Sequence, residues 1–236
     1  MVESGRLPAI RVGKQWRFSR PEIERWLQSQ SQSPAAPLEP LPQPATPTPT
    51  ATSPLRDILP VACVQLIQDA FADILGVMMV VTDMQGNPVT NLSNPCGFFT
   101  ALTRAPSSWS HCLHTWQGLG TDPALAPRFL PSEMGLLCAR GLIRVENDLK
   151  GMLVVGGIAP EAWPPAADAL ARLATIFGQD LTTVQANVGL VYRMDRTSQE
   201  RVLASAQKIA DIFSHIVSDR NVLCGRLQAI AALTTL

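Results

Sequence analysis

A proline-rich stretch between Ser31 and Leu59 divides this chain into two separate folding units. Ser, Gln, Ala, Thr and Pro dominate the stretch, and a proline recurs every two to five residues. Such a composition cannot bury a core and is typical of an extended, polyproline-like spacer. We therefore expect a small module over residues 1–30, a linker over 31–59, a globular domain over 60–217 and a helical tail over 218–236.

The charges of the chain are balanced overall but unevenly placed. The 19 basic and 19 acidic residues cancel, yet residues 1–26 hold six basic against three acidic side chains, so the rest is acidic by three. No apolar run reaches 18 residues, and the N-terminus is too charged for a signal peptide. We expect a cytoplasmic protein that makes no membrane contact. Its five cysteines, an odd number, predict reduced thiols rather than a disulfide scaffold.

The first thirty residues predict a β-hairpin followed by a helix. Two alternating runs, Leu7–Val12 and Gln15–Phe18, are joined by a turn, and Ser19 is placed to cap the helix that contains Pro21. The string GRLPAIRVGKQWRFSRPEIERWL resembles the second half of an excisionase-like, MerR-related winged helix-turn-helix domain, in which the hairpin is the wing.

That resemblance implies DNA binding, with cations of the wing on phosphates that flank the recognised bases. In the family, the first helix and most of the recognition helix precede this segment. The expectation is therefore a truncated chain, a misplaced start, or loss of the half that reads DNA, and the alternative is that the cations form a solvated face of a remnant. The residues matched to the wing and its entrance are Arg6, Arg11, Lys14, Gln15 and Arg17.

The globular domain opens with a pattern typical of a helix that leads into an antiparallel hairpin. Gly76 stands where a helix ends in the left-handed region, Val77–Val81 predicts a short buried strand, and Asp83–Pro88 predicts a turn before a return strand at Val89-Thr90. The predicted core face of the helix is Leu66, Ile67, Ala70, Phe71, Ile74 and Leu75, with Gln68, Asp69 and Asp73 off it.

A second hairpin and several helices complete the predicted domain. Alternation over Gly141–Glu146, a turn over Asn147–Gly151 and an apolar run over Met152–Gly157 predict the hairpin. Helices are predicted over residues 109–117 and after Pro164, and Thr197–Glu200 fits a capping box for a last helix. That helix carries an apolar seam, which packs on its own domain or on a second copy in a homodimer: Leu203, Ala206, Ala210, Phe213 and Val217.

Residues from about Pro60 to Val217 resemble the PocR-type sensory domain. The strings that carry the resemblance are LIQDAFADILGVMMVVTDMQGNPVT, the spaced cysteines Cys96 and Cys112, CARGLIRVENDLKGMLVVGGI, and the helical close. The resemblance implies a PAS/GAF-like α+β fold, with an antiparallel sheet and flanking helices. It also implies a small-molecule ligand, such as a diol or another hydrocarbon derivative, and a place in bacterial regulation.

The cysteines are the candidate site residues of this domain. Cys96, Cys112 and Cys138 stand at the positions of that family's recurrent cysteines, and with His111 or His114 they could form a zinc-like set. The alternative is three small buried thiols that line a pocket or core. The family's usual Cys-His pair reads Cys138-Ala139 here, which removes one candidate ligand. Cys63 and Cys224 lie on helical faces and are expected in the core.

Two functions remain open at this point. The first is a ligand-sensing transcriptional regulator, in which a bound ligand shifts the C-terminal helices and biases DNA binding by a dimer. The alternative is a sensor module that acts through protein partners without DNA. An enzyme is not expected, because adjacent His111 and Cys112 on a helix point to different faces and no acid is placed to orient the histidine.

Overall fold

The computed structural model describes residues 10–12, 15–17, 21 and 54–233. They belong to two compact units, residues 1–43 and 44–236. In the first unit, β1 (Ile10–Val12) and β2 (Gln15–Arg17) pair antiparallel, with Arg11 opposite Trp16. The hairpin predicted from the alternating runs is therefore confirmed, while Arg6 and Lys14 lie outside the described residues.

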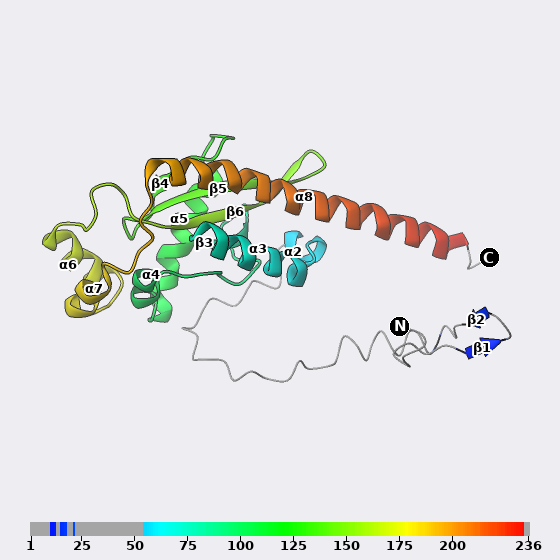
Figure 1. The fold of residues 1–236 in the computed structure, drawn as a ribbon, viewed down its shortest axis with the longest axis horizontal. Helices are drawn as coiled ribbons and strands as arrows, with labels where there is room; N and C mark the ends of the chain where they lie inside the picture. The colour runs from blue at the N-terminus through cyan, green and yellow to red at the C-terminus, as the bar shows by residue number, and fades with distance from the viewer. Residues whose placement is uncertain (1–9, 13–14, 18–20, 22–53, 234–236) are drawn as a thin grey trace. The chain divides into compact units, whose positions relative to one another are not determined.

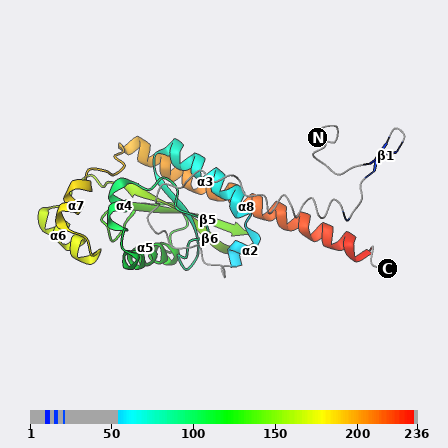
Figure 2. The ribbon, with the colours of Figure 1, turned by 90° about the horizontal axis from the view of Figure 1, so that it is seen from below.

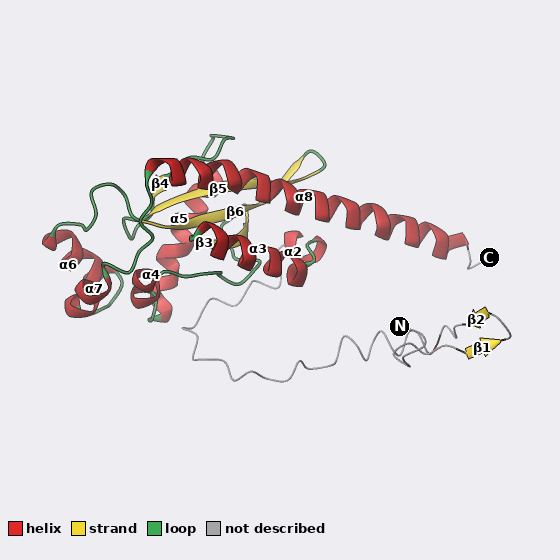
Figure 3. Ribbon diagram, in the orientation of Figure 1, coloured by secondary structure: helices red, strands yellow, loops and turns green. Residues whose placement is uncertain are grey.

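The second unit is built on a four-stranded antiparallel sheet in the order β3-β6-β5-β4 (Figures 1 and 3). The long strands β5 and β6 form its centre, and β4 covers only the first residues of β5. The predicted α+β class, with an antiparallel sheet and flanking helices, is confirmed. The strands are β3 (Met78–Asp83), β4 (Leu130–Pro131), β5 (Leu137–Val145) and β6 (Asp148–Ile158).

Helices cover both faces of this sheet. Figure 2 shows α3 and α8 on one side of the strands and α4 and α5 on the other, with α6 and α7 at one end of the domain. The helices are α2 (Pro54–Ile58), α3 (Val61–Leu75), α4 (Gly97–Leu102), α5 (Trp109–Thr121), α6 (Ala167–Ile176), α7 (Leu181–Asn187) and α8 (Arg196–Leu233), with a short 3-10 turn, η1 (Pro106–Ser108), before α5.

Each face of the sheet has its own buried cluster, because successive side chains of a strand point to opposite faces. On β3, Met78 and Val80 join the cluster under α4 and α5, whereas Met79 and Val81 join the cluster under α3 and α8. On β5, neighbouring Cys138 and Ala139 are divided in the same way. The strands are therefore buried on both sides.

The buried face of α3 differs from the prediction. Leu66 and Ile74, which were expected in the core, are 72% and 76% exposed, and Gln68, which was expected outside, is fully buried. The Gln68 amide nitrogen donates to the carbonyls of Met79 and Asn91, at 3.1 and 2.8 Å. These bonds satisfy a polar group that would otherwise be costly to bury, and they fix the rotation of the helix. The prediction failed because Gln68 is polar yet buried.

The two predicted hairpins also differ in detail. Gly76 caps α3 in the left-handed region, as predicted, with φ of 61°. The return segment at Val89-Thr90 is not a strand: both backbone N–H groups donate to the Val81 carbonyl, and isolated bridges to β3 form only on either side of it, at Pro88 and Ser93. In the second hairpin the turn is shorter than predicted, because Asp148 to Gly151 already pair with β5.

The linker ends earlier than its composition predicted. Residues 54–58 form α2, and Leu55 and Leu59 are buried in the cluster beneath α3 and α8. These residues therefore belong to the folded domain rather than to the spacer.

Helix α8 runs without a break through the predicted boundary at residue 217. The Asp195 carboxylate accepts a bond from the Ser198 N–H at 2.8 Å, so Asp195, not the predicted Thr197, caps the first turn. The predicted seam packs on the helix's own domain, where Ala206, Ala210 and Phe213 are fully buried.

Close packing joins α8 to β5. A Cβ added to Gly141 would lie 2.3 Å from the Ala206 carbonyl oxygen, so only glycine allows this approach. Beyond the sheet the helix is exposed, including Val222, Leu223 and Leu227. Cys63 and Cys224 are exposed as well, which corrects their expected place in the core.

Candidate functional site

A cavity lies between the sheet and α5, on the face of the sheet away from α8. Its empty volume is about 460 Å³, which includes space open to solvent. It is lined by residues of β3, β5, β6, α4 and α5, of the segments before α4 and before β5, and of the end of α6: Met78, Met79, Val80, Leu92, Phe99, His111, Cys112, Thr115, Trp116, Ser132, Glu133, Met134, Leu136, Cys138, Val154, Gly156, Gly157 and Phe177.

The floor of the cavity is formed by the strands. Met78 and Val80 alternate toward it from β3, and Cys138 comes from the start of β5. Glycines on β6 make room beside them: a Cβ on Gly156 would lie 2.9 Å from the Cys138 sulfur, and Gly157, at φ of 81°, lies against the Met78 sulfur. Gly156 and Gly157 thus leave room for the Cys138 and Met78 side chains, which line the cavity.

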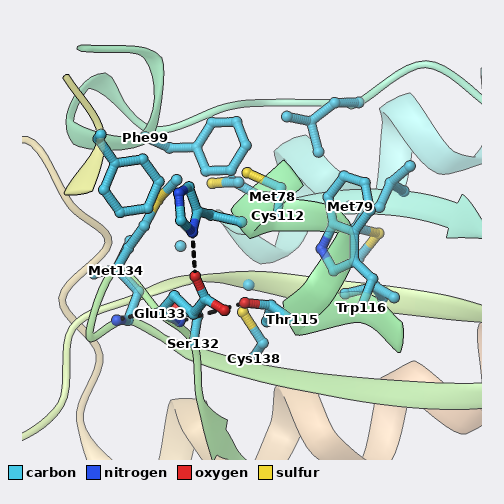
Figure 4. A pocket seen from close by; sticks show the side chains of 18 residues that line it. Met78, Met79, Phe99, Cys112, Thr115, Trp116, Ser132, Glu133, Met134 and Cys138 are labelled. Carbon is cyan, nitrogen blue, oxygen red and sulfur yellow. Dashed lines mark hydrogen bonds and ion pairs between the residues drawn. The ribbon is translucent and has the colours of Figure 1, made fainter. Parts of the chain in front are cut away.

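The roof is formed by α5 and the loop before β5. His111 and Thr115, one helical turn apart, face the cavity together with Trp116. Figure 4 shows Ser132 and Glu133 approaching from the loop, with Thr115 beside them and Phe99 and Met78 across the cavity. The Glu133 backbone N–H donates to the Thr115 hydroxyl at 3.3 Å, which fixes the loop on the helix.

Glu133 carries the principal charge of the cavity and is held by two histidines of α5. Its Oε2 lies 2.5 Å from the His111 Nδ1, and its Oε1 is bonded to the His114 Nδ1. Burial raises the pKa of this carboxyl, but the bonds and the attraction from the two rings outweigh burial and hold the pKa below its ordinary value. Glu133 is therefore ionised at neutral pH, and each ring donates its Nδ1–H to the carboxylate.

A second depression continues beside this cavity along α5. The two share Thr115, Glu133 and Cys138, and the second is extended by residues of α5 and β4. Glu133 thus lies where the cavity meets the surface, with its side chain 32% exposed.

Comparison with protein families identifies the domain that contains this cavity. A model described as the sensory domain found in PocR matches residues 57–218, more than half of the chain. The chain belongs to the PocR sensory-domain family. A helix-turn-helix domain model matches residues 1–31, which include the β1-β2 hairpin. No curated protein and no solved structure was found to match the chain.

The structure brings together only part of the cysteine set expected in the PocR sensory domain. Cys112 and Cys138 both line the cavity, whereas Cys96 is buried at the start of α4 outside the lining. Burial raises the pKa of all three thiols, that of Cys138 to about 12. They are therefore neutral at pH 7.

The described residues gather no set of metal ligands around these thiols. Within residues 54–233 and the hairpin strands, no three His, Cys, Asp or Glu side chains lie together as metal ligands. The residue that replaces the family's usual histidine, Ala139, lies on the opposite face of the sheet from Cys138. Cys112 and Cys138 line the cavity.

The same geometry gives the PocR domain no activated nucleophile. An activated cysteine has a lowered pKa and an adjacent base. Burial raises the pKa of Cys112, and its sulfur lies 3.9 Å from the Ser108 carbonyl oxygen. Cys112 therefore lacks the lowered pKa of an activated cysteine.

Sequence reasoning missed the contribution of Glu133, which lies in an irregular loop without a motif. The available signal was the spacing of His111 and His114, three residues apart and hence on one side of a helix. The candidate DNA contacts lie in the other unit: Arg11 is in β1, and Gln15 and Arg17 are in β2. None of the described helices combines the length and apolarity that a membrane span needs.

Proposed function

We propose that this protein is a ligand-sensing transcriptional regulator. A small apolar or amphiphilic molecule, such as a diol or another hydrocarbon derivative, binds in the cavity of the sensory domain. The helix-turn-helix segment converts the bound state into a change in DNA occupancy. The matches to a sensory domain and to a helix-turn-helix domain support a regulator that combines sensing with DNA binding. The change in DNA occupancy on ligand binding is our proposal.

The observation that supports coupling is that one strand serves both the cavity and α8. Cys138 of β5 lines the cavity, and four residues later the backbone of Leu142 is bonded to Gln207 of α8. A ligand that displaces the start of β5 therefore acts on the strand that holds α8. A ligand shifts the equilibrium only by its difference in affinity for the two positions.

We further propose that the exposed end of α8 pairs with the same helix of a second copy. Leu223 and Leu227 are 58% and 57% exposed and lie four residues apart, on one side of the helix. Pairing would double the phosphate contacts and raise DNA affinity. Light scattering after gel filtration tests this: the double change Leu223→Asp and Leu227→Asp yields monomers, whereas Val222→Asp, on a different side of the helix, leaves dimers.

DNA binding is tested by fluorescence anisotropy with genomic fragments at low salt, where phosphate contacts are strongest. We expect affinity to fall as salt rises, and the double change Arg11→Ala and Arg17→Ala to weaken binding to all fragments. Arg172→Ala is the matched control, because this exposed arginine of α6 pairs with Asp168 in the sensory domain. Absence of binding at low salt would contradict the regulator function.

The second candidate is a sensor that acts through protein partners without DNA. The exposed apolar side chains Leu66 and Ile74 on α3 favour it, because large aliphatic residues at such exposure often mark contact surfaces. Under this function, Leu66→Asp and Ile74→Asp abolish signalling while the Arg11 and Arg17 changes do not. Under the regulator function the outcomes are reversed.

A further inference from the structure

The lining of the cavity contains a carboxylate but no lysine or arginine. This composition indicates which class of ligand the proposed sensor would bind. Glu133 is ionised, and the 18 lining residues include no lysine or arginine. A carboxylate or phosphate ligand would therefore meet the Glu133 carboxylate without a lysine or arginine in the lining to compensate its charge.

The polar end of the cavity accepts hydrogen bonds more readily than it donates them. A carboxylate offers about four acceptor positions, and the two histidines occupy one on each oxygen of Glu133. At least two positions on Glu133 thus remain for donors of a ligand.

The rest of the cavity suits a cation with an apolar body. Phe99, Trp116 and Phe177 present aromatic rings to it, and aromatic faces attract ammonium groups. Met78 and Met134 add flexible thioethers that adapt to an alkyl chain. Figure 4 shows Phe99 and Met78 facing the side where Glu133 and Thr115 lie, so the apolar wall and the acceptor group face one space.

We propose that the cavity binds small organic amines, with the ammonium group on the Glu133 carboxylate and the hydrocarbon part among Phe99, Met78 and Met134. An alcohol of the same length enters the same space, but it donates a single hydrogen bond to the carboxylate and brings no positive charge of its own. A carboxylic acid of that length is excluded. The inference rests on the proposed sensory function and names its ligand class.

The test is a titration of the full chain with hexylamine, 1-hexanol and hexanoate by isothermal calorimetry at pH 8. An alkylammonium, with a pKa similar to that of lysine, is still cationic there. The ammonium adds Coulomb attraction to its hydrogen bonds with the carboxylate, so we expect hexylamine to bind about tenfold more tightly than hexanol, which corresponds to roughly 1.4 kcal/mol. Hexanoate is expected to give no heat. Equal or tighter binding of hexanoate overturns the proposal.

Variants of Glu133 identify the group that makes the preference. Glu133→Gln keeps the shape and removes the charge, so it is expected to weaken hexylamine about tenfold and to leave hexanol unchanged. Glu133→Asp keeps the charge and is expected to keep the preference for the amine. The control is Glu161→Gln, which removes an exposed carboxylate outside the cavity and is expected to leave hexylamine binding unchanged. A hexylamine affinity that is the same in Glu133→Gln and the parent overturns the proposal.

The outcome also separates the ligand class from the sensory function. If hexanol binds and hexylamine does not, the amine class is wrong while the cavity remains a ligand site. If hexylamine binds with the expected preference but never alters DNA anisotropy, the ligand class stands and the regulator function is contradicted. Failure of all three compounds to bind overturns the amine class.

Discussion

Gln207 of α8 bonds to both backbone polar groups of Leu142 on β5. Its Oε1 accepts the Leu142 N–H at 2.9 Å, and its Nε2 donates to the Leu142 carbonyl at 3.0 Å. Strand β4 pairs only with the start of β5, so the amide of one side chain substitutes here for a neighbouring strand. The helix that leaves the domain is thereby bonded to the centre of the sheet.

Replacing Gln207 is expected to destabilise the domain. In Gln207→Ala both groups of Leu142 lose their partner in a part-buried position, which costs about 1–3 kcal/mol. Urea unfolding followed by circular dichroism measures the loss. Lys208→Ala, the next and exposed position on α8, is the control and is expected to change stability by less than about 0.5 kcal/mol. Equal effects of the two changes would contradict this role.

Because α3 buries Gln68 and exposes Leu66, the effects of substitutions on stability are expected to be opposite to those that hydrophobicity alone would predict. Gln68→Leu places an apolar side chain where four polar partners, Met79, Thr90, Asn91 and Ser93, lose their bonds, and we expect a loss of about 2–4 kcal/mol. Leu66→Ser, at a position 72% exposed, is expected to be near neutral. Thermal unfolding of both variants measures the two changes in stability. A larger loss in Leu66→Ser than in Gln68→Leu would contradict the buried face described for α3.

Two glycines provide a matched pair for the packing of α8. Gly141→Ala brings a Cβ to 2.3 Å from the Ala206 carbonyl oxygen and is expected to cost about 1–3 kcal/mol. Gly118→Ala, within α5 and with no atom near the added Cβ, is expected to stabilise by about 0.5–1 kcal/mol. Chemical denaturation measures both, and a neutral Gly141→Ala would show that α8 does not pack closely on β5.

The bonds between Glu133 and the two histidines predict a dependence of stability on pH. The pKa of Glu133 is lowered in the folded state, so its contribution is complete above the unfolded value of about 4.3 and is lost as pH falls through the folded value. Melting temperatures of the parent and Glu133→Gln are therefore expected to differ above about pH 5 and to converge in more acidic buffer. The other carboxylates are the same in both proteins, so their titration cancels in the difference between the two melting temperatures. A difference that stays constant down to pH 3 contradicts the prediction.

The cysteines are expected to react in two groups. Cys63 and Cys224 are exposed, whereas Cys96, Cys112 and Cys138 are buried, with pKa values that burial raises. Because the thiolate is the reactive form, iodoacetamide is expected to modify two thiols in the native protein and five in denaturant. Intact-mass spectrometry counts the adducts. Rapid native modification of Cys112 would show that the cavity is open to solvent at the thiol.

Much of this domain follows from local pattern, and the exceptions have physical causes. The hairpin of β5 and β6, the helix over residues 109–117 and the left-handed Gly76 depend on neighbours in the sequence, so they could be predicted. The face of α3 and the position of Glu133 depend on partners that are distant in the sequence, namely Asn91 for Gln68 and His111 for Glu133. Spacing along one segment does not reveal such pairs. The cysteines were expected to be either ligands or pocket thiols, and their spacing in the sequence does not distinguish the two.

The alternation along β5 has a consequence for how such sensors diversify. Cys138 faces the cavity, and Ala139, the next residue, faces α3 and α8. Under the proposed coupling through α8, a substitution at one position alters what is recognised without disturbing the response, and a substitution at its neighbour does the reverse. Recognition and response would then lie on alternate residues of one strand, so a lineage could acquire a new signal molecule in single steps while its output stays intact.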